Sequence, residues 1–565
     1  MKKIVRVAQV FLFCLLLFPV SCQRKKKAPE SNAINEIGLK RGDIISCGPP
    51  GKEFGSVAFE TSCPDNVKKD FDLAVALLHS FEYDEAEKVF AKIIDDEPGC
   101  TMAYWGAAMS NYHPLWAPPT QPELEKGAKA IALAQSLPQG SQMETGFINA
   151  IAEFYKDWTT TDHRPRSLAY EKAMENIFKT YPASKEAAIF YSLALVATAD
   201  PADQTFFNQR KAGSILTSLF PEGPNHPGIV HYIIHTYDYP ELALLALPAA
   251  RKYAAIAPSS AHAQHMPSHI FTRLGLWDEC IGSNIAAASS AKCYAESAGL
   301  KGHWDEELHA LDYLVYGYLQ KGENSLAKQQ WDYLNTMQDV SPVNFKVLYA
   351  FAAIPSRYVL ENKLWKEAAA LPMPPLHLPW EKFTWQKAII HFTRLLGSAH
   401  TGNLDSAKAE LKKLTEIRQA LMDQKDDYKA GQVQIQVKTG EAWILLKEGK
   451  SKEALTSMKA AVSMENKTEK HPVTPGEVLP AMELLADMLL QLNKPAEALS
   501  AYEASLKKHP NRFNGLYGAA LASERNNNSE KATFYYQQLL AITNSGTAVR
   551  QELQAAKAFL KKKDN

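Results

Sequence analysis

The sequence predicts an all-α fold, a right-handed solenoid in which helix-turn-helix units stack one after another. Three observations support this prediction. A sequence motif recurs every 34 residues, and windows rich in Ala, Leu, Lys and Glu carry apolar residues with a helical period along nearly the whole chain. The chain has 565 residues, which is too long for one compact core, whereas a solenoid grows by adding units.

The repeat is clearest near both ends of the chain. A frame begun at Val67 places the residue types of such a repeat in their expected slots: Leu73 and Ala74 at positions 7 and 8, Ala86 at 20, Phe90 at 24 and Pro98 at 32. The next frame begins 34 residues later at Thr101, and two further frames begin at Leu479 and Phe513. We therefore expect a pair of helices in each frame, with neighbouring pairs burying a shared apolar face.

Prolines suggest where the solenoid divides. Residues 371–379 contain four prolines, which interrupt the helical pattern. The predicted organisation is a lipoprotein signal peptide (1–21), a tether and N-terminal segment (22–64), an N-terminal solenoid (65–340), a junction (341–380) and a C-terminal array (381–565).

The charge balance and the motifs exclude several classes of function. Lys plus Arg and Asp plus Glu both number 62, so no overall positive field favours nucleic acid, and we expect no nucleic-acid partner. The chain has no complete phosphate-binding loop, no HExxH and no GxSxG. The sequence thus favours binding over catalysis.

The N-terminus has the layout of a secretion signal. A basic start precedes an apolar run at 7–18, which is too short to span a bilayer as a mature helix. The run ends in PVSC at 19–22, which resembles a bacterial lipoprotein cleavage box with Cys22 as the lipidated residue, although Pro19 stands where leucine is usual. We expect export, a lipid anchor in the cell envelope and a flexible tether over 23–45. An ordinary signal peptide with an incidental cysteine is the alternative.

Five more cysteines follow Cys22: Cys47, Cys63, Cys100, Cys280 and Cys293. An exported compartment permits disulfides. Cys63 and Cys100 each precede the first helix of consecutive repeats, so stacking brings them to the same end of neighbouring helices. We predict a Cys63–Cys100 disulfide, with Cys47–Cys63 as the rival pairing.

Several segments resemble a family of exported bacterial tetratricopeptide repeat proteins that has no established reaction: FETSC at 59–63, AVALLHSFEYDEAEKVF at 74–90, AYWGAAMSNYHPLWAPP at 103–119, HYIIHTYD at 231–238 and HMPSHIFTRLGLW at 265–277. The resemblance covers roughly residues 59–330. It implies the helical-repeat fold and the exported location, and it leaves the function open.

Histidines recur at fixed positions of three consecutive repeats. Frames begin at Pro227 and Ala261, and after a 13-residue insertion at Leu308. Positions 2, 5 and 9 of their first helices hold a set of candidate ligands: His231 and His235, then His262, His265 and His269, then His309 and Asp312. Tyr316 occupies position 9 of the last of these helices.

In tetratricopeptide repeat proteins these positions face the concave groove, and residues four apart share one helical face. The imidazoles and the Asp312 carboxylate are therefore predicted to converge on a site for Zn²⁺, Fe²⁺ or Mn²⁺, whose usual ligands they are. Eight of the 16 histidines lie between positions 226 and 309, which favours a common role. The alternative is that each histidine is a half-buried donor bonded to a carbonyl or a nearby tyrosine.

A second groove element is predicted in the repeat that begins at Thr101. Trp105 and Met109 occupy positions 5 and 9, and His113 and Trp116 follow where the turn should be. With Tyr316, these side chains could hold a peptide. Alternatively, Trp116 and its neighbouring prolines cap an inserted loop.

Two functions follow from these patterns. The first is a lipid-anchored scaffold that binds a peptide or protein partner in its concave groove. The alternative is a metal-binding protein or metal-dependent enzyme built on the histidine cluster.

Overall fold

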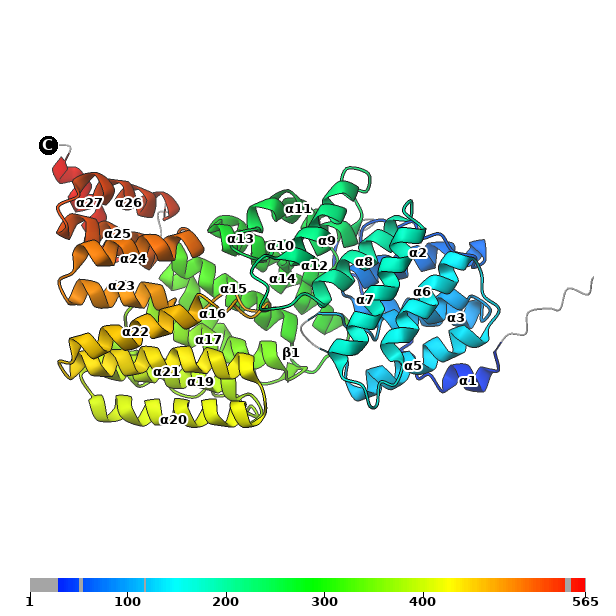
Figure 1. Ribbon diagram of the computed structural model, residues 1–565, viewed down its shortest axis with the longest axis horizontal. Coiled ribbons are helices and arrows are strands. Elements are labelled where there is room, and N and C mark those ends of the chain that lie inside the picture. Colours follow the sequence, from blue (N-terminus) through cyan, green and yellow to red (C-terminus); the bar gives the residue numbers. More distant parts are fainter. Residues whose placement is uncertain (1–28, 50–53, 116–117, 544–549, 564–565) are drawn as a thin grey trace, which may run out of the picture.

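The computed structural model describes residues 29–49, 54–115, 118–543 and 550–563, and helices make up most of these segments (Figure 1). The N-terminal region contains α1 (Ser31–Asn35), the 3-10 helix η1 (Asp65–Val67), α2 (Lys68–His79), α3 (Tyr83–Asp96), α4 (Thr101–Met109), α5 (Gln121–Ser136), α6 (Gln142–Tyr155), α7 (His163–Thr180), α8 (Lys185–Ala197) and α9 (Phe207–Leu219). The fold is therefore the all-α solenoid that the sequence predicts.

The central region continues the stacking. It contains α10 (Pro227–Tyr237), α11 (Ala243–Ile256), α12 (Ala261–His265), α13 (Pro267–Leu274), α14 (Trp277–Ser297), β1 (His303–Trp304), α15 (Asp305–Gln320), α16 (Asn324–Leu334), β2 (Val340–Ser341), α17 (Phe345–Glu361) and α18 (Trp365–Ala369). The two short strands pair in parallel, with His303 opposite Val340.

The C-terminal array contains α19 (Thr384–Thr401), α20 (Leu404–Asp423), α21 (Asp427–Lys447), α22 (Ser451–Glu465), α23 (Ala481–Gln491), α24 (Pro495–Lys508), α25 (Phe513–Arg525), α26 (Ser529–Ile542) and α27 (Gln551–Lys563). Figure 1 shows this array at the opposite end of the molecule from the N-terminal helices.

The predicted repeat frames coincide with observed helices. Helices α4, α10, α12 and α25 begin at the residues that open their frames, and α10 begins with Pro227, whose fixed φ suits a first helical position. Pro267 has the opposite effect within a frame. It divides one first helix into α12 and α13, because proline supplies no N–H for the helical ladder.

Helical packing continues across the predicted junction at 341–380. Helix α17 packs against both α15 and α19. One apolar core extends from Leu308 to Ala522, so it includes helices on both sides of the prolines. The prolines of 371–379 therefore form a connection on a continuous solenoid and do not separate two cores.

The prediction of a flexible tether over 23–45 is wrong for the later part of that range. Ile34, Ile37 and Leu39 are buried in the N-terminal core, and Arg41 pairs with Asp95 at 2.9 Å. Apolar burial holds this segment against the first repeats. The signal peptide and Cys22 lie outside the described residues.

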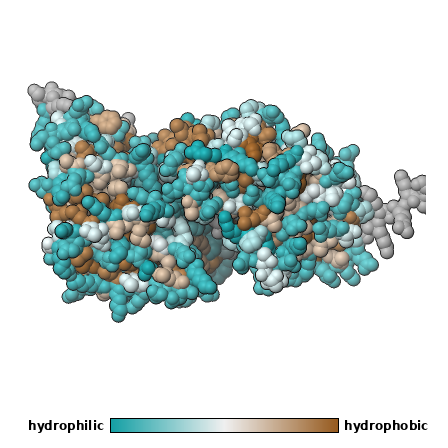
Figure 2. All heavy atoms as spheres, in the orientation of Figure 1, coloured by the Kyte–Doolittle hydropathy of each residue, from teal (hydrophilic) through white to brown (hydrophobic). Residues whose placement is uncertain are grey.

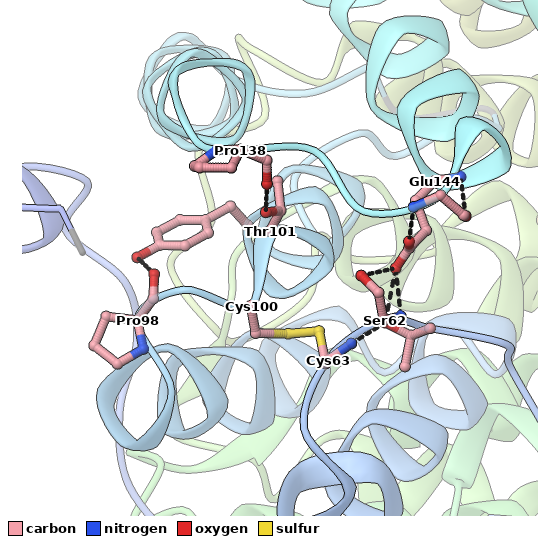
Figure 3. The surroundings of a disulfide bond; sticks show 10 residues. Ser62, Cys63, Pro98, Cys100, Thr101, Pro138 and Glu144 are labelled. Atoms are coloured by element: carbon pink, nitrogen blue, oxygen red, sulfur yellow. Dashed lines mark hydrogen bonds between the residues drawn. A yellow bond between two sulfur atoms is a disulfide. The ribbon is translucent and has the colours of Figure 1, made fainter. Parts of the chain in front are cut away.

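Two disulfides tie the N-terminal segment to the solenoid. Cys63 bonds to Cys100, as predicted (Figure 3). Beside it, the backbone N–H of Ser62 donates to the Glu144 carboxylate at 2.7 Å. The rival Cys47–Cys63 pairing is wrong, because Cys47 bonds to Cys293 at the end of α14. In the part of the chain that the structure describes, none of the helices is both long and apolar enough to cross a membrane.

The C-terminal array curls back onto the central region. The indole N–H of Trp277 donates to the carbonyl of Asn511 at 2.7 Å, and the Asn511 amide donates to the carbonyl of Gly275 at 3.2 Å. Helix α25 also contacts α15. These contacts place the array beside the histidine-bearing helices.

Candidate functional site

The structure gathers all six predicted histidines into two adjacent groups. The first trio is His231 and His235 of α10 with His262 of α12. The second trio is His265 of α12, His269 of α13 and His309 of α15. In each trio the candidate ligand atoms lie within 4.8 Å of one another. Each trio thus combines two histidines four residues apart with the position-2 histidine of the next repeat.

The Nε2 atoms of the first trio converge. His231 Nε2 lies 2.9 Å from His235 Nε2 and 3.1 Å from His262 Nε2. The Nδ1–H of His231 donates to the backbone carbonyl of His79 at 2.6 Å. Because a carbonyl only accepts, this bond places the lone pair of neutral His231 on Nε2.

The second trio has the same arrangement with different supporting groups. The Asn284 amide donates to the carbonyl of Cys280, so its Oδ1 faces His265 and accepts from His265 Nδ1 at 2.7 Å. His269 Nδ1 donates to Asp238 at 3.0 Å. The Nε2 atoms of His265 and His269 then face each other at 3.0 Å, and both carry lone pairs.

Aromatic rings and burial keep water from most of these imidazoles. Between ring centroids, Phe81 lies 4.4 Å from His231, Tyr253 stacks on His231 at 4.9 Å, and Tyr313 lies 4.7 Å from His265. Burial lowers the pKa of His231 to about 3 and also lowers the pKa values of the other five histidines. The imidazoles are therefore neutral at neutral pH.

Asp238 connects the second trio to the C-terminal array. Its carboxylate accepts from His269, from Arg273 at 2.9 Å and from Lys470 at 3.0 Å. Burial would raise the pKa of Asp238, but the two cations outweigh burial and hold that pKa well below its usual range. Lys470 belongs to the loop between α22 and α23, residues 466–480, which we call the groove loop.

The prediction that Asp312 joins the histidines is wrong. Asp312 pairs with Arg357 of α17 at 3.4 Å and lies outside both trios. Burial raises the pKa of Asp312 to about 6, and Arg357 opposes this shift. His309, three residues earlier on α15, supplies the third ligand of the second trio. A helix presents residues three apart at different angles, and α15 packs against both α12 and α17.

Sequence reasoning missed a third group: His79, Glu186 and His226. Both histidines donate through Nε2 to the Glu186 carboxylate, at 2.9 and 2.8 Å, and the Tyr232 hydroxyl bonds His79 Nδ1 at 3.0 Å. Burial alone would raise the pKa of Glu186, yet His226 and His79 lower it. These residues come from three distant segments, so spacing along the chain offered no signal for the group.

Most of the predicted groove residues are buried in the core. Trp105 has no exposed surface and packs against Phe59 and Phe147, because the N-terminal segment covers this face of α4. Met109 is 4% exposed, so it does not line an open groove either. Tyr316 is also buried, and its hydroxyl accepts from Arg512 at 2.8 Å.

The turn after α4 carries the remaining two groove candidates. The His113 ring lies 3.5 Å from the Glu123 carboxylate and 4.4 Å, between ring centroids, from Tyr83. Burial lowers the pKa of His113. Trp116 lies outside the described residues.

An open cavity of about 50 Å³ lies instead in the C-terminal array, between α17, α19, α21 and the groove loop. Its lining includes Tyr349, Trp385 and Gln436. The side-chain oxygen of Gln436 is buried and has no hydrogen-bond partner among the described residues. Figure 2 shows that one face of the molecule is hollowed near its centre, between the N-terminal helices and the C-terminal array.

The groove loop packs against the neighbouring helix α17. Arg357 donates to two consecutive backbone carbonyls of the loop, to Gly476 at 2.7 Å and to Glu477 at 2.8 Å. The Phe345 ring stacks on His471 of the loop at 4.3 Å. These contacts hold the groove loop against α17.

Comparisons with known proteins agree with the helical-repeat fold. Residues 483–547 match the tetratricopeptide repeat family. No curated protein matches the chain. Similar solved structures include human IFIT1 as a dimer with PPP-AAAA (12% identity, 86% of this chain and 96% of that chain, TM-score 0.35). Another is the APC/C hetero-tetramer Cut9–Hcn1 (12% identity, 88% and 90%, TM-score 0.31). Their low TM-scores mean that neither likeness informs the function.

The family match covers α23 to α26, and helix pairs with the same 34-residue period begin at Thr101 and Pro227. A tetratricopeptide repeat match thus covers one stretch of the C-terminal array, and the described residues form an all-helical solenoid whose helix pairs recur with the same period.

Proposed function

We propose that this protein is an exported, lipid-anchored scaffold that binds an extended segment of a partner protein in the C-terminal array. The observation that carries the proposal is the tetratricopeptide repeat match in this array, together with the cavity beside the groove loop. The groove loop already occupies the Arg357 donors, so side-chain pockets beside the loop would supply the contacts to an extended partner segment. The cavity next to the groove loop is such a pocket.

The chemistry of the cavity indicates the kind of segment that fits. Trp385, Phe392 and Ile435 offer apolar surface, and the unpartnered oxygen of Gln436 accepts a hydrogen bond. A segment with an apolar side chain and a free backbone N–H would satisfy both. The cavity of about 50 Å³ is smaller than most ligand pockets, so it suits one small side chain of such a segment.

Site-specific crosslinking in cells tests the binding site. A photo-reactive amino acid at Gln432, which lines the cavity, should crosslink to a partner polypeptide. The same probe at Lys412, an exposed residue of α20, is the matched control. Crosslinks that require the cavity position support the proposal. Equal crosslinking from both positions, or none from Gln432, contradicts it.

Soluble peptides give a second test of the same site. Peptides selected from a random library on the full chain should bind the Gln436→Met variant several-fold more weakly, because that change removes the acceptor and keeps the volume. The Lys412→Met variant should bind them as the parent does. Equal binding by all three proteins would place the interaction elsewhere.

The location rests on the PVSC segment at 19–22 and gains support from the two disulfides, since such bonds persist in oxidising compartments. Replacement of Cys22 by Ala should abolish incorporation of a labelled fatty acid and release the protein from membranes. A Cys22→Ala protein that still carries the label would exclude this anchor.

A further inference from the structure

The two histidine trios contain a hydrogen-bonding conflict that protein atoms alone do not resolve. His265 donates through Nδ1 to Asn284, and His269 donates through Nδ1 to Asp238. Both neutral rings therefore present a lone pair at Nε2, and these two atoms are 3.0 Å apart. The Tyr313 hydroxyl lies 3.3 Å from His269 Nε2 and can donate to that lone pair, but the lone pair of His265 still faces it. A cation between the two Nε2 atoms would be bound by both.

The first trio has a related imbalance. His231 Nε2 is an acceptor, because His231 Nδ1 donates to the carbonyl of His79. Two other Nε2 atoms, those of His235 and His262, approach it at 2.9 and 3.1 Å. One lone pair cannot accept from both at once. Three lone pairs can bind one cation together.

The distances agree with metal coordination. Zinc binds imidazole nitrogen at about 2.0–2.1 Å in tetrahedral geometry, so two such nitrogens stand roughly 3.3 Å apart. The observed Nε2 separations of 2.9–3.1 Å are slightly shorter. A small outward movement of the rings would admit an ion.

The supporting hydrogen bonds are those of a built metal site. Metal-binding imidazoles usually donate their other N–H to a carboxylate or carbonyl, which fixes the tautomer. His231, His265 and His269 each have such a partner: the His79 carbonyl, the Asn284 amide oxygen and the Asp238 carboxylate. The partners come from separate helices, so they do not follow from the spacing of the histidines.

The group of His79, Glu186 and His226 provides an internal comparison. It also brings three potential ligands together in the core. There, however, each histidine N–H meets a carboxylate oxygen and the remaining His79 nitrogen meets a hydroxyl. His226 Nδ1 has no partner among the described residues, but both Nε2 atoms bond the Glu186 carboxylate and not another imidazole, which distinguishes this group from the two trios.

We propose that each of the two histidine trios binds one late first-row transition-metal ion of the Zn²⁺ class, giving two adjacent metal sites on consecutive repeats. Imidazole is the ligand type that Zn²⁺, Cu²⁺, Co²⁺ and Ni²⁺ accept, whereas Mn²⁺ favours oxygen ligands. Because Asp312 pairs with Arg357, neither trio includes a carboxylate, which disfavours Mn²⁺. Three nitrogens leave a fourth position for water or another group.

The repeat explains why there are two sites. His231 and His265 occupy the same position of consecutive repeats, and so do His235 and His269. Helix α12 contributes to both sites through His262 and His265, one turn apart. The proposal is independent of the cavity in the C-terminal array.

Metal content of the full chain tests the proposal. The protein is purified in mild detergent without a histidine tag, stripped with a chelator, incubated with Zn²⁺ and analysed for metal. We expect about two equivalents per chain, a higher melting temperature, and much weaker uptake of Mn²⁺. Loading with Co²⁺ should give the absorption bands of a low-coordinate site.

Single replacements separate the two sites. His231→Gln and His269→Gln should each remove one equivalent, and the double variant should bind none. His303→Gln is the control, because His303 lies outside both trios and bonds Glu307 at 2.8 Å. Circular dichroism establishes that each variant is folded. One equivalent or none in the parent, or two equivalents in the double variant, would overturn the proposal.

A milder substitution tests whether metal loss comes from the site itself and not from misfolding. Asn284→Ala removes only the acceptor of His265 Nδ1 and leaves every proposed ligand in place. Loss of such a supporting partner typically lowers metal affinity 10- to 100-fold. We expect this weakening in one of two Zn²⁺ dissociation constants, with the stoichiometry retained. Unchanged affinities would contradict the assignment of the second site. If His265 and His269 instead share a proton between their Nε2 atoms, none of these proteins should take up metal.

Discussion

The guanidinium of Arg512 donates to both carboxylate oxygens of Glu483, at 2.9 and 3.0 Å, and both side chains are buried. Arg512 also bonds Glu361 of α17 at 2.7 Å and the hydroxyl of Tyr316 of α15 at 2.8 Å. This network joins the start of α25 to the histidine-bearing helix α15. It explains how the C-terminal array is held against the central region.

Replacement of Arg512 by Met should destabilise the protein strongly. Two buried carboxylates, Glu483 and Glu361, would lose their cation, and breaking a buried pair in this way costs about 3–5 kcal/mol. Urea unfolding followed by circular dichroism measures the loss. Arg251→Met is the control, because the exposed Arg251–Glu279 pair should contribute no more than about 1 kcal/mol. Similar losses in the two variants would refute the role of the buried network.

The two disulfides should contribute unequally. Cys47–Cys293 closes a loop of 246 residues and Cys63–Cys100 one of 37 residues. In the chain-entropy description these loops correspond to about 5 and about 4 kcal/mol. Removal of the first pair by alanine replacement should therefore lower the melting temperature more than removal of the second. A larger effect of the Cys63→Ala/Cys100→Ala variant would show that local packing outweighs loop entropy.

Trp105 should behave as a core residue. Because the indole is fully buried among aromatic rings, Trp105→Ala should cost about 3–5 kcal/mol through lost burial and the resulting cavity. Trp105→Phe should cost much less, because the indole N–H has no hydrogen-bond partner among the described residues. Thermal unfolding measures both. If Trp105→Ala were nearly neutral, the side chain would not belong to the core.

Stability should fall in acid partly through His400. This ring lies between Trp365 at 3.8 Å and Trp443 at 4.2 Å, between ring centroids, and burial lowers its pKa to about 3. The unfolded chain takes up the proton near pH 6.5, whereas the folded chain does so only near pH 3. The stabilising contribution is therefore complete above pH 6.5 and is lost as the pH falls toward 3.

The His400→Phe variant isolates this contribution. Between about pH 4 and 6 its unfolding free energy should depend less steeply on pH than that of the parent, by roughly 1.4 kcal/mol per pH unit for one proton. Chemical unfolding at several pH values measures the slopes. Identical slopes would show that His400 titrates normally in the folded chain.

Much of the fold could be predicted from the chain alone, because each repeat carries its own apolar spacing. Frames at Thr101, Pro227 and Phe513 coincide with helices that begin at those residues. The Cys63–Cys100 bond was predictable for the same reason, since neighbouring repeats stack in order. Contacts between consecutive repeats are local in sequence, and the helical period reports them.

The position of the histidines within the frames also predicted that they would gather. It did not predict their division into two trios or the exclusion of Asp312, because a frame position does not specify the angle at which a helix meets its neighbours. Trp105 was assigned to an open groove for a similar reason. The segment around Phe59, which covers α4, lies outside the repeat pattern.

The order of helices, the 34-residue register and the shared face of His231 and His235 follow from periodicity, which is a property of adjacent residues. Other contacts join segments that are more than 100 residues apart. They include the bond from His231 to the His79 carbonyl, the bond from Arg357 to the groove loop and the bond from Arg512 to Tyr316. Such contacts arise when the superhelix curls back on itself and buries polar groups that must then find partners. No local pattern in the sequence encodes these long-range contacts, so only the tertiary structure decides them.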